Sequence, residues 1–281
     1  MKKILKYFLF FISTICFAFE WPVNENTLKN LYISFAQKRG ESFVQSIVFT
    51  ESNDVYSCEA GKVLVCINNN TSDSGWFDSP LGNAIILSHT GNLLSIYSNL
   101  DKIFLTKEDK SVQVSEKIAT SGFSGWQEGL SSFEFSIADT KNQTIINPLV
   151  LMNKENLNNP VIIKNVVAIN KKGNVYDLST QKYLSAGTYM LYRENSSMPF
   201  KTQVSVNGAA VETVSYDILS QINKQLTVQG KKNYNVDSIY VKDNRQFLAE
   251  VVLSRGKNTI IITTFDINGN ERNVRFFVDV N

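Results

Sequence analysis

Short apolar segments that alternate with polar residues follow one another along most of the chain, and clusters of Gly, Asn and Asp separate them. The clearest example is Leu81–Leu100. Ala84–Leu87 is a short apolar run, Thr90-Gly91-Asn92 is typical of a turn, and an extended apolar pattern resumes at Leu94. This order predicts a β-hairpin that is buried on at least one face.

The second half of the chain, from about Pro160, shows the same succession of short apolar segments and turn residues. Its apolar runs are separated by turn signals such as Asn207-Gly208 and Asn268-Gly269-Asn270. Many short strands at this spacing predict a β-sandwich. The expected strands are 161–169, 175–178, 187–192, 200–206, 238–241, 249–253, 259–265 and 274–280. Two segments depart from the strand period. The spacing within 28–35 is consistent with a short amphipathic helix or a docked arm, and the spacing within 216–226 fits a short helix.

The N-terminus has the pattern of a secretory signal peptide. Lys2, Lys3 and Lys6 precede an apolar run from Tyr7 to Phe17, and Ala18 provides a small residue at the end. The run is too short to span a bilayer, so we expect residues 1–18 to be removed and the protein to be exported to the periplasm or cell envelope. The alternative is a lipoprotein acylated at Cys16, although Ile15 is bulky for such a site.

Composition excludes an electrostatically driven nucleic-acid partner. Without the three lysines of the signal segment, 25 basic residues stand against 26 acidic ones, a net charge of −1. The strand-forming composition and the length are sufficient for two modest cores. Cys58 and Cys66 lie on consecutive strand-like segments around Gly61, which we interpret as a hairpin with two buried thiols rather than a disulfide.

The predicted hairpin also carries a family resemblance. The order of Gly82, Ile85-Ile86, His89, Tyr97 and Leu100 resembles the central hairpin of the lysostaphin/LytM-type zinc endopeptidases, peptidase family M23, which contain a duplicated hybrid motif. Further blocks in the same order extend the resemblance over about 35–152. They are 39–49, 55–67, 112–125, 131–137 and 147–148. The resemblance implies a mainly β fold, with an antiparallel LytM-type sheet domain.

The positions that carry chemistry in this family are replaced. By the resemblance, Val44, Val48 and Glu134 stand at the three zinc-ligand positions, and Asn99 and Ser132 stand at the two catalytic histidine positions. A valine has no lone pair for a cation, so we expect no metal, no cofactor and no catalysis. Glu134 is then expected to be hydrogen-bonded or ion-paired.

Two other classes of function stay open. An active cell-wall metalloendopeptidase would need a rebuilt site, but His89 is the only histidine, and we interpret it as structural. A serine hydrolase built on Ser132 would lack an activating base. The third class is a purely structural envelope protein.

The favoured function is binding. The resemblance implies that the vacated groove binds peptidoglycan or an envelope protein such as a cell-wall amidase, with regulation of a cell-wall hydrolase as one form of this role. The loops 68–80 and 121–131 would form its walls. They carry Trp76, Phe77, Phe123 and Trp126, which can supply contact area for a sugar ring or a partner's side chain. Alternatively, these aromatic side chains cover the edge of the sheet.

The expected organisation therefore has three parts. Residues 1–18 are a signal peptide, residues 19–153 are a degenerate LytM/M23-like peptidase domain, and residues 160–281 are a second domain. The segment 255–280 resembles the last hairpin of bacterial immunoglobulin-like modules, so we expect an immunoglobulin-like β-sandwich there. Its scattered aspartates predict no catalytic site.

Overall fold

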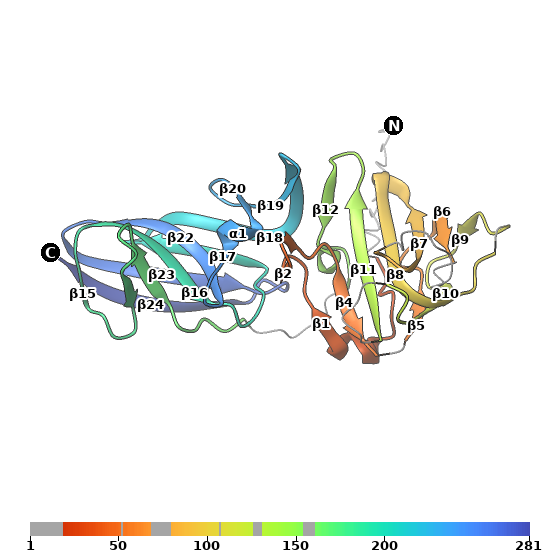
Figure 1. Cartoon of the computed structure of the whole chain (residues 1–281), viewed down its shortest axis with the longest axis horizontal. Coiled ribbons are helices and arrows are strands. Elements are labelled where there is room, and N and C mark those ends of the chain that lie inside the picture. Colours follow the sequence, from red (N-terminus) through yellow and green to blue (C-terminus); the bar gives the residue numbers. More distant parts are fainter. Residues whose placement is uncertain (1–18, 52, 69–79, 107, 126–130, 154–160) are drawn as a thin grey trace, which may run out of the picture.

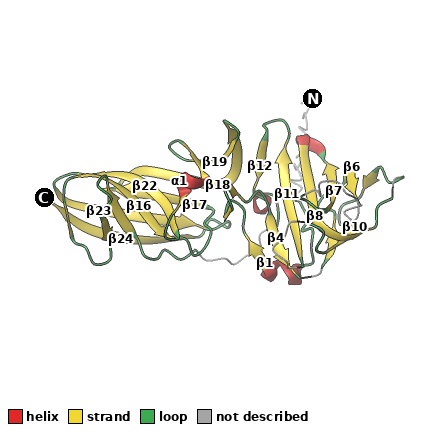
Figure 2. Ribbon diagram, viewed as in Figure 1, coloured by secondary structure: helices red, strands yellow, loops and turns green. Residues whose placement is uncertain are grey.

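In the computed structural model the chain is almost entirely β-structure, in two lobes that lie end to end (Figures 1 and 2). The structure describes residues 19–51, 53–68, 80–106, 108–125, 131–153 and 161–281, so the predicted signal peptide, Trp76, Phe77 and Trp126 lie outside the described residues. Within the described part, no helix has the length and hydrophobicity needed to cross a membrane. The prediction of a mainly β fold is confirmed.

An antiparallel sheet forms the first lobe. Its strands follow the spatial order β1-β4-β11-β8-β7-β6-β9, while β10 pairs with both β5 and β8. The predicted hairpin at 81–100 is confirmed as β7 and β8. The elements are η1 (Glu25–Asn30), β1 (Leu31–Ile33), β2 (Lys38–Arg39), β3 (Ser42–Phe43), β4 (Ile47–Thr50), β5 (Asp54–Tyr56), β6 (Gly61–Ile67), β7 (Asn83–Ser88), η2 (Thr90–Asn92), β8 (Leu93–Ile103), β9 (Ser111–Val112), β10 (Lys117–Ser121), β11 (Ser132–Asp139), β12 (Thr144–Ile146) and η3 (Pro148–Val150).

The second lobe is a β-sandwich. One sheet has the order β14-β13-β16-β22-β21, and it faces a sheet built from β15, β24, β23, β17, β18, β19 and β20. The elements are β13 (Val167–Asn170), β14 (Val175–Asp177), β15 (Tyr183–Leu184), β16 (Gly187–Glu194), β17 (Lys201–Val206), β18 (Ala209–Ile222), β19 (Gln225–Gln229), β20 (Asn233–Asn235), α1 (Val236–Ile239), β21 (Tyr240–Val241), β22 (Arg245–Leu253), β23 (Gly256–Phe265) and β24 (Glu271–Val280).

Several local predictions are wrong. Residues 216–226 form strands β18 and β19 rather than a helix, and 28–35 divides into the 3-10 helix η1 and strand β1. Residues 55–67 are not a simple hairpin, because β5 pairs with β10 whereas β6 pairs with β7 and β9. Both thiols are free, as expected, but only Cys58 is buried, and Cys66 is exposed.

A single sheet continues from one lobe into the other. Strand β12 pairs with β11 on one side and with β18 on the other, where Ile145 is the partner of Leu219 (Figure 1). Asn147 adds two bonds just beyond β12, since its backbone N–H donates to the Asp217 carbonyl at 2.8 Å and its side chain to the Tyr216 carbonyl at 3.2 Å. The backbone hydrogen bonds of β12 are therefore satisfied only when the second lobe is in place.

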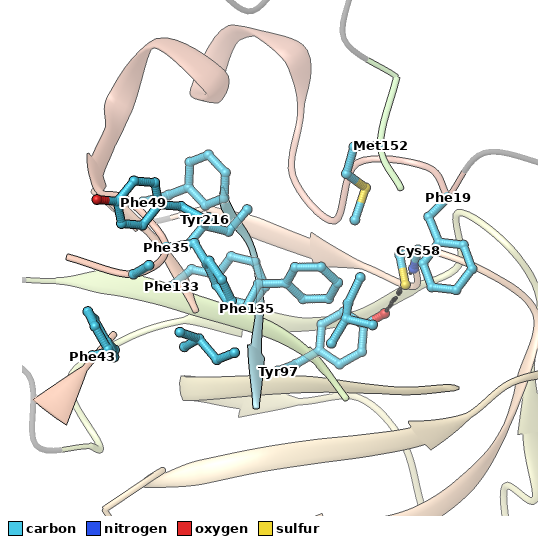
Figure 3. Packing of buried hydrophobic residues seen from close by; sticks show 14 of the residues in the cluster. Phe19, Phe35, Phe43, Phe49, Cys58, Tyr97, Phe133, Phe135, Met152 and Tyr216 are labelled. Atoms are coloured by element: carbon cyan, nitrogen blue, oxygen red, sulfur yellow. Dashed lines mark hydrogen bonds between the residues drawn. The ribbon is translucent and has the colours of Figure 1, made fainter. Parts of the chain in front are cut away.

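Apolar packing also crosses the junction. One core cluster contains the first lobe's aromatic residues and also Tyr216, Leu219 and Tyr240 from the second (Figure 3 shows part of it). The Tyr240 ring packs edge-on against Phe43 at 6.1 Å between centroids, and its hydroxyl donates to the Ala36 carbonyl at 2.8 Å. A separate cluster fills the far part of the sandwich. The two lobes therefore share a core as well as a sheet.

Candidate functional site

The candidate site lies on the face of the first sheet opposite its aromatic core, where strands β4, β11 and β8 run side by side. On β11 the apolar residues Phe133, Phe135 and Ile137 point into the core, so Ser132 and Glu134 point to the other face. Glu134 is the register partner of Val48 on β4 and of Ser98 on β8. The sheet thus places two of the predicted ligand positions directly opposite each other.

Glu134 accepts hydrogen bonds from two side chains of the segment that precedes β4. The Arg39 guanidinium donates to both carboxylate oxygens, with Nη2 to Oε1 at 2.9 Å and Nη1 to Oε2 at 3.3 Å. The Ser46 hydroxyl donates to the same Oε1. The expectation that Glu134 is paired is confirmed. A fixed cation, the guanidinium, is therefore bound to the carboxylate that would otherwise be available to a metal.

Val44 and Val48 are both buried, with 2% and 1% of their surface exposed. Neither side chain can donate electrons to a metal ion. A zinc ion at this site would have one carboxylate ligand and the positive charge of Arg39 within bonding distance of that ligand. The residues present do not fit a zinc centre. Among the described residues, no cluster of three or more His, Cys, Asp or Glu side chains is placed to hold a metal.

Asn99 and Ser132 are brought together, but as a structural pair. The Asn99 amide nitrogen donates to the Ser132 carbonyl and hydroxyl, both at 2.8 Å, and to the Gly122 carbonyl at 2.7 Å. Its Oδ1 accepts from the Gly125 N–H at 2.8 Å. Both side chains are buried, and Asn99 has a φ of +60°, which asparagine tolerates better than most residues. Asn99 therefore fastens the 121–125 loop to β11.

His89 belongs to a different cluster, on the core side of the β7–β8 hairpin. Its Nδ1 lies 3.0 Å from the Ala60 carbonyl and its Nε2 lies 2.7 Å from the Ser95 hydroxyl. The network continues through the Tyr97 hydroxyl to Cys58 Sγ, 3.2 Å apart (Figure 3). A Cβ on Gly61 would lie 2.8 Å from His89 Nδ1, so close packing on His89, rather than a tight turn, requires glycine there. The structural interpretation of His89 is supported by these contacts.

The two thiols should differ in reactivity. Burial raises the pKa of the Cys58 thiol to about 12, whereas Cys66 is exposed on β6 although its pKa is also raised. Since the thiolate is the nucleophile, we expect iodoacetamide at pH 8 to modify Cys66 in the folded chain lacking residues 1–18 and to spare Cys58 until denaturant is added. Peptide mass spectrometry measures this. Modification of Cys58 at the same rate as Cys66 would contradict the buried network.

Of the four predicted binding aromatics, only Phe123 is described. Its side chain is 66% exposed, so it does not cover the edge of the sheet. Arg39 and Ser46, the partners of Glu134, were not among the predicted site residues. Arg39 lies 95 positions from Glu134 in the sequence. The family resemblance assigned no role to Arg39 or to Ser46.

The first lobe is similar to a known protein family. A family model described as peptidase family M23 matches residues 44–148, the segment that contains β4, β8 and β11. This match makes residues 44–148 similar to peptidase family M23, and the lobe that contains them is referred to as the M23 domain. A different family model, which carries no description, matches residues 160–281. No curated protein sequence matches the chain.

Solved structures similar to the M23 domain include a zinc-containing peptidase from Vibrio cholerae, with 24% identity and a TM-score of 0.35. That match covers 43% of this chain and 36% of the Vibrio protein, so the chain spans about a third of that relative's length. The catalytic domain of lysostaphin from Staphylococcus simulans matches with 18% identity over 41% of this chain and 86% of that one, at a TM-score of 0.33. The SpoIIQ–SpoIIIAH pore-forming complex matches with 15% identity, 49% and 92% coverage, and a TM-score of 0.36.

Proposed function

We propose that the chain is a catalytically inactive M23 homologue that acts in the bacterial envelope as a peptidoglycan- or protein-binding module. The observation that carries the proposal is the state of the predicted metal site. Its ligand positions hold Val44, Val48 and a Glu134 already bound by Arg39 and Ser46. The residues at the catalytic positions, Asn99 and Ser132, are bonded to each other.

The proposal extends to location and partner. Export through the signal-like segment 1–18 would bring the M23 domain to the cell wall. There we propose peptidoglycan or an envelope protein such as a cell-wall amidase as the partner, with regulation of the hydrolase as one outcome of binding. Phe123 is solvent-exposed, and we propose that it contributes to the binding surface together with Trp76, Phe77 and Trp126.

Metal content and hydrolysis test the inactive state. We expect the purified chain lacking residues 1–18, after incubation with zinc and gel filtration, to retain far less than one zinc ion per molecule by elemental analysis. It should release no dye-labelled fragments from sacculi above the buffer blank. The physical reason is that a catalytic zinc needs three protein ligands, and two of the three positions are valines. Stoichiometric zinc together with cleavage would overturn the proposal.

A restored variant is the matched control. Val44→His, Val48→Asp and Glu134→His rebuild the ligand set, and Arg39→Ala removes the competing cation. Because the β4–β11 register is unchanged, this variant should gain zinc in the same assay. Binding is then measured separately by co-sedimentation of the unsubstituted chain with intact sacculi and by capture of a purified cell-wall amidase. Absence of both interactions would favour a purely structural role.

A further inference from the structure

The outer face of the second lobe's sheet carries two exposed aromatic rings, Tyr183 on β15 and Phe277 on β24. Each is 62% exposed, among the highest values of any large apolar residue in the described chain. Both line one hollow of about 570 Å³, together with Lys182, Lys257, Thr259 and Asp279. Strand β15 and the C-terminus lie at the end of the sandwich away from the M23 domain (Figure 1).

Strand register shows how these side chains are arranged. Tyr183 is the parallel partner of Asp279, and Asp279 is the antiparallel partner of Lys257, so these three side chains form one row across the sheet. Phe277 and Thr259 form the next row. Successive rows on one face are about 7 Å apart, and the two rings lie diagonally across neighbouring strands. One ligand a few rings long can therefore contact both aromatics.

Single exposed apolar residues are common on protein surfaces, but two aromatic rings that share one hollow indicate a binding site. The polar groups around them narrow the class of ligand. Lys182 and Lys257 are opposed by Asp279, so the hollow has no single sign of charge that would select an anion such as a phosphate. A purely apolar ligand would desolvate the lysine and aspartate side chains without replacing their hydrogen bonds.

A neutral pyranose oligosaccharide satisfies both requirements. The C–H groups on one face of a pyranose ring are weakly positive and pack on the negative face of an aromatic ring, while its hydroxyls donate and accept hydrogen bonds at the ring edge. Lys257 donates, the Asp279 carboxylate accepts, and Thr259 does both. We propose that this hollow, the Tyr183–Phe277 platform, binds a neutral glycan chain. The inference concerns the second lobe and does not depend on whether the M23 domain is inactive.

The test uses the chain lacking residues 1–18 and two soluble probes, the β-1,4-linked tetramers of glucose and of N-acetylglucosamine, titrated by calorimetry and by NMR shift mapping. We expect at least one tetramer to bind. Tyr183→Ala with Phe277→Ala should weaken that binding by about tenfold or more, because the stacking contacts are lost. Both side chains are mostly exposed, so the melting temperature should stay unchanged.

Tyr32→Ala is the control for loss of an exposed aromatic residue elsewhere, since Tyr32 is 54% exposed on β1 of the first lobe. It should leave tetramer binding unaltered. The inference is overturned if neither tetramer binds, or if the double variant binds as tightly as the unsubstituted chain while remaining folded. Absence of tetramer binding would not change the zinc and hydrolysis results that test the inactive state. Zinc binding or hydrolysis would likewise leave the Tyr183–Phe277 platform untouched.

Discussion

Leu219→Asp should unfold both lobes together, with a loss of about 4 kcal/mol or more in the free energy of unfolding. Leu219 has no exposed surface, lies opposite Ile145 of β12, and belongs to the core cluster that both lobes share. A carboxylate there would lose its hydration among the apolar side chains of that cluster, which is among the costliest single changes a core can receive.

The position of the tryptophans makes the coupling measurable. All three, Trp21, Trp76 and Trp126, precede residue 154, whereas Leu219 lies in the second lobe. Urea unfolding followed by tryptophan emission therefore reports on the first lobe while the substitution is in the second, and far-UV circular dichroism reports on the whole chain. If the tryptophan transition keeps its midpoint in Leu219→Asp, the two lobes unfold independently. The shared core would then contribute nothing to the stability of the first lobe.

Ile218→Asp is the matched control for this experiment. Ile218 is the preceding residue of the same strand, pairs with Ile146 of β12, and is 39% exposed. Its side chain points away from the shared core, so a carboxylate there remains hydrated and should cost about 1 kcal/mol or less. A similar loss in both variants would mean that strand propensity, rather than burial at the junction, causes the effect.

Asn99→Ala should cost about 3–4 kcal/mol, because it removes four hydrogen bonds from a fully buried position and places alanine at a φ of +60°, which alanine tolerates less well than asparagine does. The carbonyls of Gly122 and Ser132 and the N–H of Gly125 would lose this partner. The measurement is the midpoint of urea unfolding, compared at constant m-value.

Asn99→Gly separates the two causes of this loss. Glycine loses the same side-chain bonds but adopts a positive φ without strain, so it should be more stable than the alanine variant by about 1 kcal/mol. Equal stability of the two variants would mean that the positive φ contributes nothing to the loss of stability in Asn99→Ala. A total loss under about 1 kcal/mol in both would contradict the structural role of Asn99 in fastening the 121–125 loop.

Sequence patterns predicted the elements whose signal is local. The 81–100 hairpin has its own turn residues, and β11 alternates apolar and polar residues with period two, so both could be identified without knowledge of their neighbours. The prediction failed for 216–226. Ile218, Leu219, Ile222 and Leu226 have a spacing compatible with a helix, and what makes this segment a strand is pairing with β12, more than 70 residues earlier.

The candidate site shows the same limit. Family positions located Val44, Val48, Asn99, Ser132 and Glu134, and the structure brings Val48 opposite Glu134 and Asn99 against Ser132. The partners of Glu134 could not be found in this way. Arg39 and Ser46 reach Glu134 from a different strand or loop, and the sequence contains no local signal that pairs them.

The shared sheet has a consequence for the order in which the chain can fold. Synthesis proceeds from the N-terminus, so β12 and Phe43 leave the ribosome well before Leu219 and Tyr240, the residues that cover them. Until about residue 250 has emerged, the nascent first lobe presents an unpaired strand edge beside an uncovered apolar surface, a combination that favours misassembly. Completion of the first lobe therefore waits for the second, and premature termination within the sandwich should produce an aggregation-prone fragment rather than a shorter folded protein.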